Sequence, residues 1–171
     1  MNLMNKLMKK RKMNNKGFSL VELIIVIAIM AILVGIVGTQ VVPYIEKSRK
    51  SKDVQILSGY CTDAMSAFSS ESAKLDPKAT YTITITPPAA GAAAGAAWTV
   101  SVAATPAAAS GASDLKTAFC ELNKLDTVAP TFGSQAGKNI TGITITCSST
   151  TSPMIKLEVA PSGSFDNITT N

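Results

Sequence analysis

The residues of this chain with the most informative chemistry are a single carboxylate and the segment around it. Glu22 stands near the start of an apolar run, and there is no charged residue from Leu23 to Val42. A lone charge at the head of a membrane-length apolar helix is costly unless a positive group pairs with it. Cleavage of the chain before Phe18 would create such a group, an amine about 6 Å from Glu22 along a helix that includes both residues. A buried pair of this kind could fix the axial register between neighbouring helices.

Three other states of the Glu22 carboxylate stay open from its position alone. It could pair with the Phe18 amine of its own chain, it could be protonated, or it could extend to the membrane interface. Each of these states would leave Glu22 without a role between chains.

The positive charge of the chain is concentrated before Gly17. Six of the 16 lysine and arginine residues lie there without an acidic residue: Lys6, Lys9, Lys10, Arg11, Lys12 and Lys16. The formal charge of +5 therefore belongs to residues 1–17, which we predict to be a leader peptide, and we expect no specific nucleic-acid partner. The positive-inside rule places this leader in the cytoplasm and the C-terminal part outside. No small-residue cleavage pattern follows Val42, so we expect any cut after Gly17.

The elements that must position Glu22 form one very long helix, expected from Phe18 to Ser72. Residues 18–42 are apolar on all sides and long enough to cross a bilayer, so they are predicted to be a transmembrane and polymerisation helix. Residues 43–75 form an amphipathic half that should end before Pro77. Glycine and proline weaken a helix interior, so the segment with Gly35, Gly38 and Pro43 is a predicted soft point.

The apolar stripe of the amphipathic half should pack on a soluble domain. Its members recur at steps of three and four residues, as Val54, Leu57, Cys61, Ala64, Met65 and Phe68. We place Asp53 on the polar side of this helix. Just before Asp53, a basic cluster of Lys47, Arg49, Lys50 and Lys52 is flanked by Glu46 and Asp53. The sequence favours a solvated face for this cluster over contact with lipid head groups or acids of a neighbouring chain.

The remaining residues, 76–171, read as a small antiparallel β-sheet domain. Alternating patterns predict four strands, at 81–86, 98–102, 140–147 and 155–159. A short helix is expected from Leu115 to Leu125, starting near Ser113 and Asp114 and burying Leu115, Phe119 and Leu122. An Ala/Gly-rich loop occupies 87–111, and 161–171 is a polar tail. The predicted fold class is therefore α+β, a long N-terminal helix packed on this sheet.

The composition argues against an enzyme. Histidine is absent, and no paired-carboxylate spacing or glycine-rich phosphate loop is found, so no catalytic residue or cofactor is expected. The three cysteines, Cys61, Cys120 and Cys147, lack metal-site spacing and form no framework. We therefore expect buried thiols, with one bridge plus a free thiol as the alternative.

The run Gly17-Phe18-Ser19-Leu20-Val21-Glu22, after a basic leader and before an uninterrupted apolar run, resembles the prepilin signature of type IV pilins. The sequence as a whole is similar to clostridial major type IV pilins. The resemblance is carried by about residues 16–51, and the C-terminal part shares only the general plan of these proteins. Pro43 lies somewhat further along the chain than the proline common in Gram-negative pilins.

The resemblance implies roles for three residues. Gly17 would end the leader that a prepilin peptidase removes, Phe18 would become the N-methylated N-terminus, and Glu22 would pair with the Phe18 amine of a neighbouring subunit. The partners implied are further copies of the chain, the peptidase and N-methyltransferase, a platform protein and a cytoplasmic ATPase. The precursor would cross the cytoplasmic membrane once before entering an extracellular pilus.

Three functions fit these patterns. The first is the major subunit of a type IV pilus, for adhesion, surface motility and biofilm formation. The second is a minor pilin or a pseudopilin of type II secretion or competence. The third is a single-pass anchored surface protein that does not polymerise, which the leader and apolar run fit equally well but Gly17 and Glu22 do not.

Overall fold

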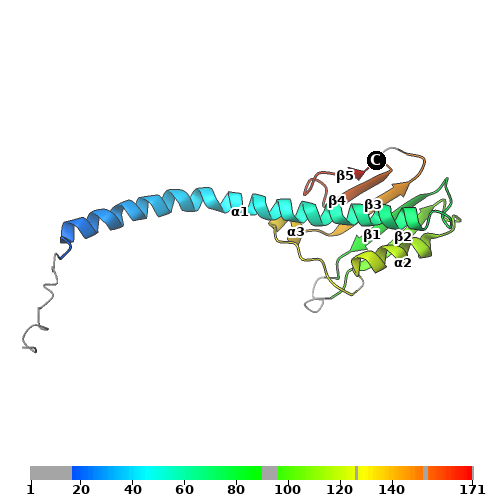
Figure 1. The fold of residues 1–171 in the computed structure, drawn as a ribbon, viewed down its shortest axis with the longest axis horizontal. Coiled ribbons are helices and arrows are strands. Elements are labelled where there is room, and N and C mark those ends of the chain that lie inside the picture. Colours follow the sequence, from blue (N-terminus) through cyan, green and yellow to red (C-terminus); the bar gives the residue numbers. More distant parts are fainter. Residues whose placement is uncertain (1–16, 90–95, 126, 152–153, 171) are drawn as a thin grey trace, which may run out of the picture. The chain divides into compact units, whose positions relative to one another are not determined.

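A computed structural model describes residues 17–89, 96–125, 127–151 and 154–170. The chain divides into two compact units, one up to Val42 and one from Pro43 onward. The elements, labelled in Figure 1, are α1 Leu20–Ser70, β1 Thr80–Thr86, β2 Thr99–Thr105, α2 Ala112–Asn123, α3 Gln135–Lys138, β3 Gly142–Ser148, β4 Ile155–Ala160 and β5 Ile168–Thr170. A long N-terminal helix packed on an antiparallel sheet confirms the predicted α+β, pilin-like fold.

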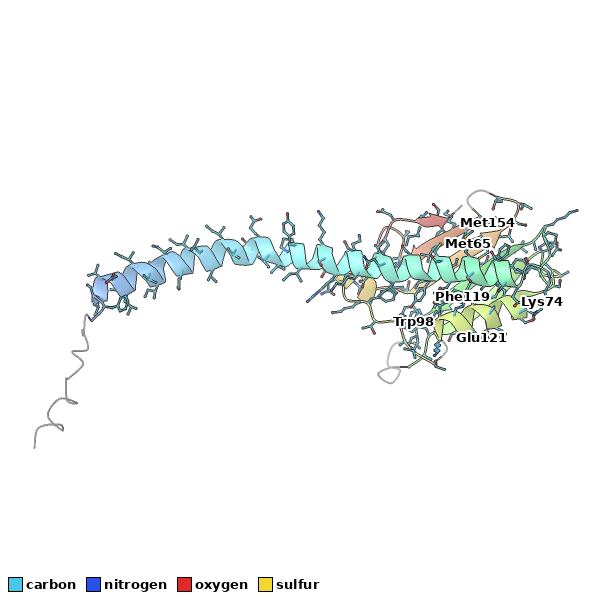
Figure 2. All side chains as sticks on the ribbon, viewed as in Figure 1. Met65, Lys74, Trp98, Phe119, Glu121 and Met154 are labelled. Atoms are coloured by element: carbon cyan, nitrogen blue, oxygen red, sulfur yellow. The ribbon has the colours of Figure 1, made fainter. Side chains whose placement is uncertain are left out.

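Helix α1 begins two residues later than the sequence predicted and ends two residues earlier. It is unbroken across Gly35, Gly38 and Pro43. In the first unit, every described side chain from Gly17 to Val42 is exposed. The apolar side chains of this segment stand on all sides of the helix (Figure 2). This segment therefore has no core within the chain.

The second unit is built on a five-stranded sheet in the order β2-β1-β3-β4-β5, with every neighbouring pair antiparallel. Alternation along each strand puts apolar side chains on one face and threonines of β1 and β3 on the other. The register aligns one apolar row across all five strands: Val102, Ile83, Ile145, Leu157 and Ile168. Figure 1 shows the second half of α1 lying across this sheet.

The part of α1 that packs on the sheet buries the predicted stripe. Leu57, Cys61, Ala64 and Phe68 are buried, while Val54 and Met65 are partly buried against the same core. The placement of Asp53 on the polar side was wrong, because its side chain is only 1% exposed. Asp53 lies one helical turn before Leu57, so it heads the buried stripe instead of facing solvent.

Hydrogen bonds explain why a carboxylate is tolerated at this buried position. The Asp53 carboxylate accepts a bond from the backbone N–H of Gly133 and another from that of Ser134, each at 2.9 Å. The Ser134 hydroxyl also donates to Asp53 and accepts from the N–H of Gly137, which caps α3. A Cβ at Gly137 would overlap the Asp53 carboxylate, so this close approach requires glycine. Asp53 thus fixes the segment 132–140 against α1.

Helix α2 covers the sheet beside β2 and begins at a glycine with positive φ. Gly111 has φ +88°, and a Cβ there would lie 2.7 Å from Leu75 Cδ2. Leu115 and Phe119 are fully buried as predicted, but Leu122 is 51% exposed and that part of the prediction was wrong. Leu125, just past the helix end, is buried in its place because the chain turns at Lys124, which adopts a left-handed conformation.

The predicted strands are confirmed with shifts of a few residues, and β2 runs three residues further than expected. Helix α3 and strand β5 were missed, since four helical residues and three strand residues show too little periodicity to be recognised. Residues 1–16 of the predicted leader and 90–95 of the Ala/Gly-rich loop lie outside the described residues.

Candidate functional site

The predicted cleavage site lies just before α1, in backbone that is neither helix nor strand. Gly17, Phe18 and Ser19 are outside the helix, and the Phe18 side chain is 84% exposed. A Cβ placed on Gly17 would meet no atom within 4 Å. The peptide bond between Gly17 and Phe18 therefore lies outside the helix, which begins at Leu20.

Glu22 lies in the first turn of α1, where a negative charge interacts favourably with the helix dipole. Its side chain is exposed, and within the described residues it forms no hydrogen bond or ion pair. The predicted spacing of one helical turn between Phe18 and Glu22 assumed a helix that includes Phe18. Because α1 begins at Leu20, helix geometry does not set the distance between the Phe18 backbone nitrogen and Glu22.

A second role for Glu22 could have been found from the spacing Ser19-x-x-Glu22. Serine followed three residues later by glutamate is the pattern of a capping box, in which each side chain accepts a bond from a backbone N–H at the helix start. In the part of the chain that the structure describes, neither side chain forms such a bond. The helix start is instead closed by the bond from Leu23 N–H to Ser19 O at 3.2 Å. The Glu22 carboxylate therefore remains available to a partner.

The surface beside Glu22 is apolar along almost all of residues 20–42. Of the helices in the described residues, α1 is the one long and apolar enough to cross a membrane. A soluble monomer rarely exposes an apolar patch larger than a few hundred Å². This surface needs lipid or other apolar helices, and its large exposed members are Leu20, Val21, Leu23, Ile24, Ile25, Val26, Ile27, Ile29, Met30, Ile32, Leu33, Val34, Ile36, Val37, Val41 and Val42.

The residues of the predicted soft point lie in this same helix. A Cβ placed on Gly35 or on Gly38 would meet no atom within 4 Å, so packing within the chain does not require either glycine. Pro43 removes one backbone N–H from the ladder of α1. The reduced helix stability of this segment stays a prediction.

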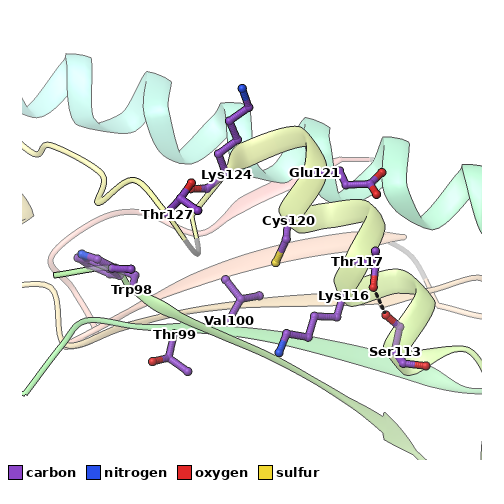
Figure 3. A pocket seen from close by; sticks show the side chains of 11 residues that line it. Trp98, Thr99, Val100, Ser113, Lys116, Thr117, Cys120, Glu121, Lys124 and Thr127 are labelled. Atoms are coloured by element: carbon purple, nitrogen blue, oxygen red, sulfur yellow. Dashed lines mark hydrogen bonds between the residues drawn. The ribbon is translucent and has the colours of Figure 1, made fainter. Parts of the chain in front are cut away.

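An open groove of about 950 Å³ lies between α2 and β2 in the second unit. Figure 3 shows Trp98 and Val100 on the side of β2 and Cys120 and Lys116 on the side of α2. The Trp98 ring contacts Phe132, with 6.0 Å between ring centroids. The lining combines apolar side chains with charged ones, among them Lys116, Glu121 and Lys124.

The three cysteines are placed as the sequence predicted for buried apolar positions. Cys61 and Cys147 are fully buried, Cys120 is half-buried, and the described chain contains no disulfide between them. Burial, with Cys61 nearby, raises the pKa of the Cys147 thiol to about 12. Among the described residues no group of three or more acidic or cysteine side chains could hold a metal ion.

The comparisons with known proteins give one match. Residues 12–38 match the family described as prokaryotic N-terminal methylation motif. The match covers the end of the predicted leader, the predicted cleavage site, Glu22 and the first part of α1. No curated protein and no solved structure matches the chain, so these comparisons do not support its similarity to clostridial major pilins in particular.

Proposed function

We propose that this pilin-like chain, which carries the N-terminal methylation motif of prepilins, is the major subunit of a type IV pilus. The observation that carries the proposal is the combination of that motif at 12–38 with an apolar helix that is exposed on every side. The protein is structural and not catalytic. Its motif implies processing by a prepilin peptidase, with passage through the membrane before display at the cell surface.

Processing would act at the open backbone before α1. The peptidase would cut between Gly17 and Phe18, and the new Phe18 amine would be methylated. Because Phe18 and Ser19 precede the helix, the amine could adjust its position to reach a carboxylate on another chain. Glu22, which has no partner among the described residues, would supply that carboxylate.

Assembly would bring the apolar surfaces of residues 18–42 from many copies together. Helix packing would replace lipid around each copy, and the pair between Glu22 and a neighbouring Phe18 amine would set the axial register. A platform protein and a cytoplasmic ATPase would drive extrusion from the cytoplasmic membrane. The second unit would form the outer surface, through which the filament would serve adhesion, surface motility and biofilm formation.

The role of Glu22 is tested by Glu22→Gln, which removes the charge and keeps the side-chain size. We expect leader removal to continue at a similar rate, because Gly17 and Phe18 are unchanged, and filament yield to fall at least tenfold. Glu22→Asp, which retains a carboxylate on a shorter side chain, should retain part of the yield. Filaments from Glu22→Gln at the normal yield would exclude the register role.

The alternative functions make different quantitative predictions. A minor pilin or a pseudopilin of secretion or competence would be processed in the same way but would be rare in filaments sheared from cells. Asp166 is the one carboxylate in residues 161–171, which disfavours the calcium-binding type of pseudopilin. A non-polymerising anchored protein would stay with the membrane fraction with its leader intact, or would be released from the cell with an N-terminus beyond Val42.

A further inference from the structure

We propose that the basic cluster of Lys47, Arg49, Lys50 and Lys52 binds the phosphate groups of anionic lipids in the outer leaflet before the subunit enters a filament. This inference rests on the proposed function, because it requires residues 18–42 to span the membrane. All four side chains are exposed and belong to the second unit. They follow the end of the apolar segment by five to ten residues along the unbroken helix α1.

The acidic residues that flank the cluster do not neutralise it. Glu46 and Asp53 are seven residues apart, about two helical turns, so they lie on one face of α1. Glu46 accepts a hydrogen bond from the N–H of Gln135 at 2.5 Å, and Asp53 accepts the bonds from Gly133 and Ser134. Both carboxylates are thus directed at backbone amides of the second unit.

The four cations of the cluster have no acidic partner among the described residues. Across the described residues, the ion pairs involve Lys74 and Lys156 and none of the four. Lys50 lies over the ring of Phe165, with its Nζ 5.4 Å from the ring centroid. Lys47, Arg49 and Lys52 therefore remain available to an anion outside the chain. Their spacing of two and three residues places them on more than one side of the helix.

The side chains between the apolar segment and the cluster favour a lipid surface over a protein one. Tyr44 is 76% exposed directly after the apolar run. Tyrosine is enriched at both membrane interfaces, where a helix passes through the head-group layer. Lysine and arginine side chains near a helix end extend to that layer, where they attract the phosphates of anionic lipids. The cluster would hold the helix at a fixed depth until assembly withdraws it.

The test uses the full chain in nanodiscs of equal phosphatidylcholine and phosphatidylglycerol, with bound lipids counted by native mass spectrometry. The variant Lys47→Gln/Arg49→Gln/Lys52→Gln removes three charges and leaves Lys50 on Phe165. The matched control Lys78→Gln/Lys116→Gln/Lys124→Gln removes three exposed lysines elsewhere in the second unit. The leader is present in all three proteins, so its own lipid binding cancels.

We expect the ratio of bound phosphatidylglycerol to phosphatidylcholine to fall about fivefold or more in the cluster variant and by less than about twofold in the control. Equal ratios in all three proteins would overturn the proposal. A cluster variant that keeps its lipid ratio but loses cross-linking between copies would also overturn it, in favour of acids on a second copy. The N-terminus of sheared material tests the proposed function separately, so the two can fail independently.

Discussion

The two halves of helix α1 differ in where their packing partners come from. From Leu20 to Val42 every side chain is exposed, although the segment is almost entirely apolar. From Pro43 to Ser70 a single stripe is buried by the chain's own sheet, and the other positions are exposed or half-buried. One continuous helix therefore combines two segments. The apolar stripe of the second is buried by the chain's own sheet, and the apolar surface of the first can be buried only by lipid or by other chains.

This difference indicates that residues 20–42 are suited to contacts outside the chain and not to a core within it. A helix that is hydrophobic all round belongs in a membrane or in the interior of an assembly, whereas a stripe at steps of three and four belongs against a sheet. Equal substitutions in the two halves should therefore have unequal effects on the stability of the second unit.

The largest expected effect comes from Leu57→Ala, which truncates a fully buried side chain and leaves a cavity in the core. We expect a loss of about 3 kcal/mol in the free energy of unfolding of the second unit. The fluorescence of Trp98, the sole tryptophan of the sequence, reports unfolding by urea in detergent micelles. The matched change Leu33→Ala, in the exposed half, should alter this free energy by less than about 0.5 kcal/mol. Equal losses from the two changes would remove the distinction between the halves.

A smaller effect is expected from Asp53→Ala. This change leaves two backbone N–H groups and the Ser134 hydroxyl without their acceptor, which should cost about 2 kcal/mol of unfolding free energy. Glu46→Ala removes one bond at the exposed edge and should cost about 0.5 kcal/mol. The same urea titration measures both variants. A cost for Asp53→Ala no greater than that for Glu46→Ala would contradict the buried anchor.

The stability of the second unit should also fall at alkaline pH. Burial, with Cys61 nearby, holds the folded pKa of Cys147 at about 12, above the unfolded value of 9.0, so between these values the unfolded state loses a proton that the folded state keeps. Unfolding free energy should therefore decrease by about 1.4 kcal/mol per pH unit from about pH 9 upward. Tyr60, whose pKa is raised to about 12 by burial and by Asp63, acts in the same direction.

Cys147→Ala isolates the thiol contribution to this pH dependence. The variant should lose less stability between pH 8 and pH 11 than the unsubstituted protein, as followed by Trp98 fluorescence. An unchanged slope would show that the Cys147 thiol is not responsible.

The smallest expected effect concerns the soft point. Gly35→Ala with Gly38→Ala should stabilise the local helix by about 1 kcal/mol at each site, because neither added Cβ meets an atom within 4 Å. Amide hydrogen exchange in micelles should then slow for residues 35–43. Gly59→Ala, equally open in the other half, should slow exchange less, since tertiary packing already holds that turn. Equal slowing at the two locations would argue against a soft point.

Long, periodic elements could be predicted from the sequence and short or tertiary features could not. The stripe containing Leu57, Cys61, Ala64 and Phe68 and the alternating strand from Tyr81 each repeat often enough to specify element and face. Strand β5 and helix α3 are too short to repeat, and Leu122 continued a helical pattern that the chain abandons at Lys124.

Asp53 shows why polarity alone misplaces a residue. Its burial depends on the backbone amides of Gly133 and Ser134, about 80 residues further along the chain, and no local sequence pattern predicts these contacts. The site around Gly17, Phe18 and Glu22, by contrast, could be predicted from sequence because it is a contiguous motif, and the roles of these residues stay predictions. The structure adds that Gly17, Phe18 and Ser19 lie outside the helix that begins at Leu20.

The mass of the N-terminal peptide from filaments sheared off the cell exterior tests the central claim most directly. The claim is that the exposed half of α1 begins, after processing, with a free amine that pairs with Glu22 of another copy. We predict an abundant chain that starts at Phe18 and is heavier by one methyl group. Filaments built from chains that still carry residues 1–17, or that begin beyond Val42, would contradict it.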